Sequence, residues 1–85
     1  MINKTQARIL RALLTETVAD YAVIQKATTL LNPIAYLSDL ISFGLVQVDE
    51  TKKIAPRNMY AITPDGEAIL RVYDRIEEHK ARWKA

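Results

Sequence analysis

The stretch NPIAYLSDLISFGLV, residues 32–46, constrains the fold most strongly, because it contains signals for both ends of one short helix. Asn32 can cap a helix that has Pro33 at its first position, where the missing N–H group costs nothing. Gly44 follows the last apolar residues, where a left-handed residue commonly ends a helix. The sequence therefore predicts a helix over residues 33–43.

The predicted helix has one apolar face and one small, polar face, as expected when one side of a helix is buried. The apolar face is formed by Ile34, Leu37, Leu40 and Ile41. The other face has no Lys or Arg and is formed by Ala35, Ser38, Asp39 and Ser42. Leu31, just before the cap, is expected to pack on Tyr36 as a hydrophobic staple.

Comparable signals predict two helices before this one. Asn3 and Gln6 can form a capping box that opens a helix over residues 4–15. Thr17 and the acidic residue three positions later repeat this spacing, so a second helix is expected over residues 18–27.

Two stretches of alternating apolar and polar residues, LVQVD and MYAIT, predict a β-hairpin over residues 45–63. The segment ETKKIAPRN between them is too long for a tight turn. Thr63 and Pro64 then provide the cap and first position of a last helix over residues 64–83. We therefore expect one mainly α, α+β domain over residues 1–85, with three helices, a two-stranded hairpin and a C-terminal helix.

Composition narrows the class of protein further. The chain has 85 residues and no Cys, so disulfides, thiolate nucleophiles and Cys-based metal sites are excluded, and a reducing, cytoplasmic location is expected. No apolar run approaches the ~18 residues that span a bilayer. With one His and no Gly-rich phosphate loop, we expect no metal, no cofactor and no enzymatic activity.

Taken together, LNPIAYLSDLISFGLVQVD and YAITPDGEAIL resemble the winged helix-turn-helix domains of regulators of the MarR, PadR and ArsR groups. The resemblance is carried by Leu37, Leu40, Gly44, Leu45, Val46, Tyr60, Ile62, Thr63 and Gly66. It implies a homodimeric transcriptional regulator that binds double-stranded DNA. In such a protein the helix over residues 33–43 would enter the major groove, and the hairpin would act as the wing.

The residues that would face the groove are neutral or acidic, although recognition helices of the resembled groups often carry Arg or Lys. They are Asn32, Ala35, Tyr36, Ser38 and Asp39. Asn can pair with adenine, Ala can contact a thymine methyl, and Asp can accept from cytosine N4. The alternative is an ordinary solvated helix face.

Phosphate contacts are therefore expected from other elements. Lys52, Lys53 and Arg57 make the predicted wing tip the densest cationic stretch, although Lys in a loop can also serve solubility alone. Auxiliary contacts are expected from Lys4, Arg8, Arg11 and Lys26, if these side chains share the side of the wing.

The last helix carries an apolar stripe at alternating spacings of three and four residues. Ile69, Val72 and Tyr73 directly follow the hairpin and are expected to pack on the domain's own core. Ile76, His79 and Trp83 lie farther along the helix and are predicted to form a dimer interface. The main rival to a DNA-binding regulator is a winged helix that binds another protein and has no DNA target.

Overall fold

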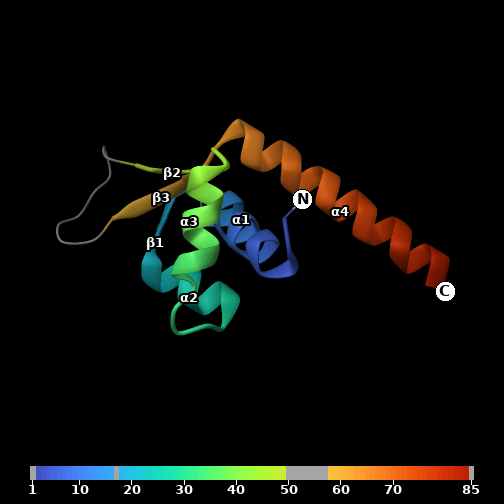
Figure 1. Cartoon of the computed structure of the whole chain (residues 1–85), viewed down its shortest axis with the longest axis horizontal. Helices are drawn as coiled ribbons and strands as arrows, with labels where there is room; N and C mark the ends of the chain where they lie inside the picture. The colour runs from blue at the N-terminus through green and yellow to red at the C-terminus, as the bar shows by residue number, and fades with distance from the viewer. Residues whose placement is uncertain (1, 17, 50–57, 85) are drawn as a thin grey trace.

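The structure is a computed structural model that describes residues 2–16, 18–49 and 58–84 (Figure 1). The elements follow in the order α1 (Lys4–Glu16), β1 (Val18–Asp20), α2 (Tyr21–Thr28), α3 (Ile34–Ser42), β2 (Val46–Val48), β3 (Met59–Ile62) and α4 (Pro64–Lys84). The domain is mainly helical with a small antiparallel sheet, as predicted. No helix in these described ranges is long and apolar enough to cross a membrane.

The sheet has three strands, in the order β1-β3-β2, whereas the sequence predicted a two-stranded hairpin. β1 pairs antiparallel with β3, with Ala19 opposite Tyr60. β2 pairs antiparallel with the other edge of β3, with Gln47 opposite Ala61. The returning strand of the predicted hairpin is therefore the central strand of the sheet.

The prediction of a helix over residues 18–27 was wrong at its start, because Asp20 is the cap of α2 and not a residue of its first turn. Its backbone is extended, with φ −86° and ψ 178°, and its carboxylate accepts a hydrogen bond from the Val23 N–H at 3.1 Å. The extended segment before it pairs with β3, which would otherwise present an open edge. Thr17, the expected cap, lies outside the described residues.

α1 is the centre of the core and contacts α2, α3, α4, β1 and β3. The predicted capping box opens it: the Asn3 N–H donates to Gln6 Oε1 at 3.0 Å, and the Gln6 N–H donates to Asn3 Oδ1 at 2.8 Å. The side chains with no exposed surface include Ile9, Leu10, Leu13, Ile24, Leu37 and Leu40. One face each of α1, α2 and α3 thus builds the core.

The start of α3 differs from the prediction. Pro33 occupies the cap position and makes no side-chain capping bond, while the Asn32 amide oxygen accepts from the Tyr21 hydroxyl at 3.0 Å. Leu31 is 92% exposed, so it does not form the expected staple with Tyr36. Both predictions were wrong, because they considered contacts within α3 only, whereas α2 supplies the partner of Asn32.

α4 packs on the core with its first turns and then runs away from the body of the molecule (Figure 1). Leu70 is buried, and Ile69 and Tyr73 pack against the core. Val72 was expected in the core but is 44% exposed. The second half of α4 therefore has little of its own domain to pack on.

Candidate nucleic-acid interface

The outer face of α3 is the part of the predicted interface that the structure describes most completely. Ala35, Ser38 and Asp39 are exposed there, above Leu37 and Leu40, which are completely buried. Tyr36 is half-buried against the core, and Asn32 is bonded to α2. Three of the five predicted groove residues therefore share one exposed face.

The turn between α2 and α3 is held by side-chain bonds to the backbone. The Thr28 hydroxyl is buried and donates to the Ile24 carbonyl at 2.9 Å, and the Gln25 side-chain amide donates to the Leu31 carbonyl. Thr29 has a left-handed backbone, with φ 58°, which is uncommon for a β-branched residue. This turn therefore fixes how the chain enters α3.

Two aliphatic side chains at this entrance point outward, which the sequence analysis missed. Leu31 in the turn is almost fully exposed, and Ile34, the first residue of α3, is 46% exposed. Periodicity placed Ile34 with Leu37 on the buried face, but it lies at the border of that face. The sequence did offer one sign of this exposure: Leu30 and Leu31 are adjacent, and neighbouring side chains on a short turn rarely both enter the core.

Another apolar surface lies at the far end of α3. Ile2, Phe43, Leu45 and Ile69 line a hollow of about 390 Å³. Phe43 is 65% exposed, although Leu45 and Ile2 beneath it are buried. The hollow lies where the start of the chain, the end of α3 and the first turns of α4 meet.

The base of the wing is formed by the pairing of β2 with β3. β2 and β3 pair with Val48 opposite Tyr60, and the Asp49 N–H donates to the Met59 carbonyl at 2.7 Å. The three predicted wing cations, Lys52, Lys53 and Arg57, lie outside the described residues.

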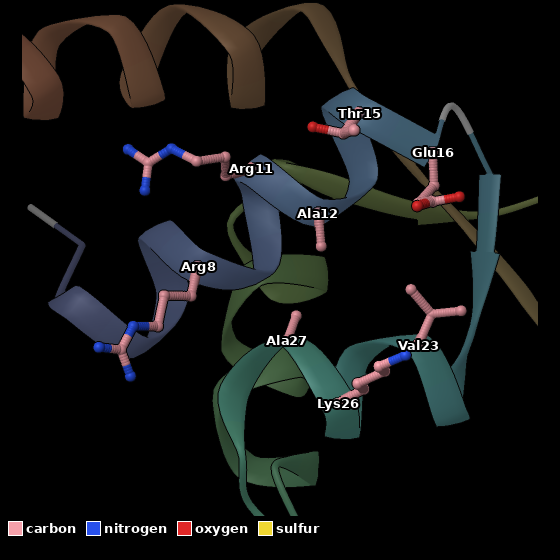
Figure 2. Close-up of a pocket in the computed structure, with 8 residues that line it drawn as sticks. All are labelled: Arg8, Arg11, Ala12, Thr15, Glu16, Val23, Lys26 and Ala27. Carbon is pink, nitrogen blue, oxygen red and sulfur yellow. The ribbon is translucent and has the colours of Figure 1, made fainter.

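Three of the four auxiliary cations line one groove of about 430 Å³ between α1 and α2 (Figure 2). These are Arg8, Arg11 and Lys26, while Lys4 is exposed at the start of α1. Arg11 forms an ion pair with Asp74 of α4. Figure 2, a view onto this groove, shows the ribbon of α3 behind α1 and α2. The structure thus gathers these cations on a different side from the exposed face of α3.

The three predicted dimer residues share one side of the outer half of α4. Trp83 is 78% exposed, and its indole N–H donates to His79 Nε2 at 2.8 Å. The two rings meet edge to face, with centroids 6.2 Å apart. Ile76 is 40% exposed one turn earlier. The structure brings these side chains together on a surface that its own domain leaves uncovered.

Among the described residues, no group of three or more His, Asp or Glu side chains is arranged to hold a metal ion.

Comparison with known proteins identifies the fold. No protein-family model matches the sequence, and no curated protein matches it. The structure is similar to BpsR of Bordetella bronchiseptica, described for the regulation of its DNA binding by 6-hydroxynicotinic acid, with a TM-score of 0.77 and 19% identity. It is also similar to NadR in complex with 4-hydroxyphenylacetate, with a TM-score of 0.66 and 27% identity. A third similar structure is Sso10a-2, a DNA-binding protein from Sulfolobus solfataricus, with a TM-score of 0.67 and 20% identity.

These matches cover nearly all of this chain but not all of the other proteins. The match to BpsR covers 95% of this chain and 58% of BpsR. The match to NadR covers 98% of this chain and 66% of NadR. The match to Sso10a-2 covers 96% of this chain and 88% of Sso10a-2. The chain therefore spans less than two thirds of the length of BpsR and NadR. The predicted winged helix-turn-helix fold is confirmed by the structural likeness to these proteins.

Proposed function

We propose that this winged helix-turn-helix chain is a sequence-specific double-stranded DNA-binding protein that acts as a homodimeric transcriptional regulator. The observation that supports this proposal is the exposed outer face of α3. Ala35, Ser38 and Asp39 lie on this face, and Leu37 and Leu40 on the opposite face are fully buried. Small side chains let a helix lie deep in a major groove about 12 Å wide. The proteins BpsR and Sso10a-2, which share the fold, are both described as binding DNA.

The attraction to phosphate is assigned to the wing. Described residues of α3 include no Lys or Arg, so α3 itself supplies shape and neutral hydrogen bonds. The sequence between β2 and β3 contains Lys52, Lys53 and Arg57. No acidic residue occurs from position 51 to 58. Such cations add affinity for any duplex, while α3 provides the preference among sequences.

The cations of the groove between α1 and α2 are assigned a smaller part. Arg8 and Lys26 lie on the side away from the outer face of α3, and Arg11 is already paired with Asp74. Lys4 is exposed at the start of α1. Solvent and salt screen charges that lie on a different side of the domain from the bound phosphates.

The second protomer is assigned to the outer half of α4. Ile76, His79 and Trp83 offer an exposed apolar and aromatic surface that extends from the body of the domain. Two copies paired there would present two α3 helices to one duplex, as expected for a two-fold symmetric operator.

The test compares two triple variants with the same change in charge. Lys52, Lys53 and Arg57 are replaced by Ala in one, and Lys4, Arg8 and Lys26 are replaced by Ala in the other. DNA retardation and fluorescence anisotropy are measured with duplexes selected from a random pool, starting at about 50 mM salt, where non-specific attraction is strong. The wing variant should lose at least about tenfold in affinity and the other less than about threefold.

Salt dependence provides a second readout. If about five cations per protomer meet phosphates, the log–log slope of affinity against salt, counted per bound protomer, should be near −4 to −5. The wing variant should lower the magnitude of this slope by about 3. A flat salt dependence, or equal losses in the two variants, contradicts the assignment of phosphate contacts to the wing. Failure to retard any duplex contradicts DNA binding itself and favours a winged helix that binds a protein.

A further inference from the structure

A small aliphatic surface is exposed at the N-terminal end of α3, and the proposed fit of the helix to the groove does not require it. It consists of Leu31, Ile34 and Ala35, which we call the methyl cluster. All three side chains are exposed, and none carries a charge or a hydrogen-bonding group. Contiguous exposed apolar surface on a protein marks a place of contact with another molecule, and these three residues lie within five positions of the chain.

The position of the cluster is fixed by the fold. The Leu31 carbonyl is held by the Gln25 side chain, and the neighbouring Asn32 is held by Tyr21. Buried Pro33 and Leu37 anchor the start of α3 from below. The backbone at Leu31 is therefore held at its own carbonyl and at the residue that follows it.

We propose that the methyl cluster reads the C5-methyl groups of thymine in the major groove, so that preferred sites carry thymine beneath the N-terminal end of α3. This inference rests on the proposed DNA binding. The N-terminal residues of a recognition helix are the ones that contact base edges in helix-turn-helix complexes. The thymine methyl is the one apolar group that a base pair presents in that groove, and aliphatic side chains recognise it.

The charges around the cluster favour DNA bases over DNA phosphates as its partner. Described residues from 27 to 42 include no Lys or Arg, and the one acidic side chain on this face, Asp39, follows a turn later. A surface of this kind gains nothing from phosphate, but it can displace water from a methyl group at the floor of the groove. Ser38 beside the cluster can add a hydrogen bond to either kind of base pair.

The experiment removes single methyl groups from the DNA. Duplexes are first selected from a random pool with the full-length chain, and each thymine of the selected site is then replaced by deoxyuridine. This change keeps the base pair and deletes only the C5-methyl. At one or two positions, the affinity should fall about fourfold per methyl. Conversely, 5-methylcytosine at a neighbouring position should not restore the affinity of the uridine duplex.

Matched variants assign the effect to the cluster. Leu31→Ala and Ile34→Ala should bring the ratio of affinities for thymine and uridine duplexes close to one, with unchanged circular dichroism because both side chains are exposed. Ile41→Ala is the control, since Ile41 belongs to the same helix and is 37% exposed, compared with 46% for Ile34. It should keep the full discrimination.

The outcomes separate this inference from the function on which it rests. A protein that binds selected duplexes but does not distinguish thymine from uridine overturns the inference and leaves DNA binding in place. The same holds if Ile41→Ala loses discrimination as fully as Ile34→Ala. A protein that retards no duplex overturns both, and loss of binding to another protein on Leu31→Ala would then identify the cluster as a protein contact.

Discussion

Among single residues, Gly66 shows most clearly how tightly the parts of this domain meet. It lies in the first turn of α4, next to the chain that leaves α3. A Cβ atom at this position would lie 2.2 Å from the Leu45 carbonyl oxygen and 2.7 Å from Ile62 Cγ1. The backbone oxygen of Leu45 cannot move aside, because it also accepts a hydrogen bond from the Thr63 N–H at 3.1 Å. Glycine is required here by contact and not by backbone conformation.

We expect Gly66→Ala to lower the free energy of unfolding by about 3 kcal/mol, because the helix must shift to admit the methyl group. Gly44→Ala is the matched control: Gly44 has φ +75° and no atom within 4 Å of an added Cβ. Its cost comes only from the left-handed backbone, about 1 kcal/mol. Urea unfolding measures both variants, and equal losses would show that the contact at Gly66 is not the cause.

Among the elements, the junction of α3 and α4 depends on one side chain. The Thr63 hydroxyl donates to the Gly44 carbonyl at 2.7 Å and accepts from the Gly66 N–H at 3.0 Å. It therefore caps the start of α4 and satisfies a carbonyl beyond the end of α3 at the same time. These two bonds hold the last helix in a fixed direction relative to the helix that we propose enters DNA.

Replacing Thr63 by Val keeps the shape of the side chain but removes both bonds, so we expect a loss of about 1–2 kcal/mol in the free energy of unfolding. Thr63→Ser keeps the hydroxyl and should retain most of the stability. Amide hydrogen exchange at Gly66 should become faster in the Val variant only. If Ser is as harmful as Val, packing of the methyl group and not capping is responsible.

Elements with local signals could be predicted from the sequence, and elements with distant partners could not. The capping box at Asn3 and the stop at Gly44 involve residues that are near in the chain, and both are confirmed. β1 was missed because its partner is far along the chain: Ala19 lies opposite Tyr60. Three residues of strand carry almost no periodic signal of their own.

For the candidate interface, too, local features could be predicted from the sequence and the packing of distant elements could not. The buried and exposed sides of α3 follow from periodicity, so Ala35, Ser38 and Asp39 were placed correctly on the surface. Where the cations of α1 lie relative to α3 depends on how helices pack, which no local pattern contains. The exposed Leu31 was missed for a related reason, since the bond from Tyr21 to Asn32 redirects the turn.

For the whole molecule, the long exposed half of α4 governs how two copies would meet. The stripe of Ile76, His79 and Trp83 is flanked on both sides by cations, namely Arg75, Lys80 and Arg82. Lys80 and Arg82 have Glu partners on their own helix, at 3.6 Å and 2.7 Å. These partners lie away from the stripe, so two copies that pair through it would still bring like charges together.

We therefore expect a homodimer that becomes tighter with salt, opposite to DNA binding. Sedimentation equilibrium should give a dissociation constant that falls several-fold between about 50 mM and 500 mM salt, because screening weakens the repulsion. Trp83→Ala should be monomeric at tens of micromolar protein, and Leu31→Ala, another exposed apolar residue, should dimerise normally. A wild-type monomer at these concentrations would contradict the dimer.

β1 joins β3 to α2, and under the proposed function this link constrains how binding sites are arranged on DNA. Its last residue, Asp20, caps α2, and its backbone pairs with β3, so one short segment is bonded both to the strand that carries the wing and to the helix that supports α3. The base of the hairpin, formed by β2 and β3, is consequently held in a fixed position relative to α2 and α3. If the hairpin and α3 contact DNA as proposed, the phosphates bound by the hairpin should lie a constant number of base pairs from the bases that α3 contacts, in every half-site and for any intervening sequence.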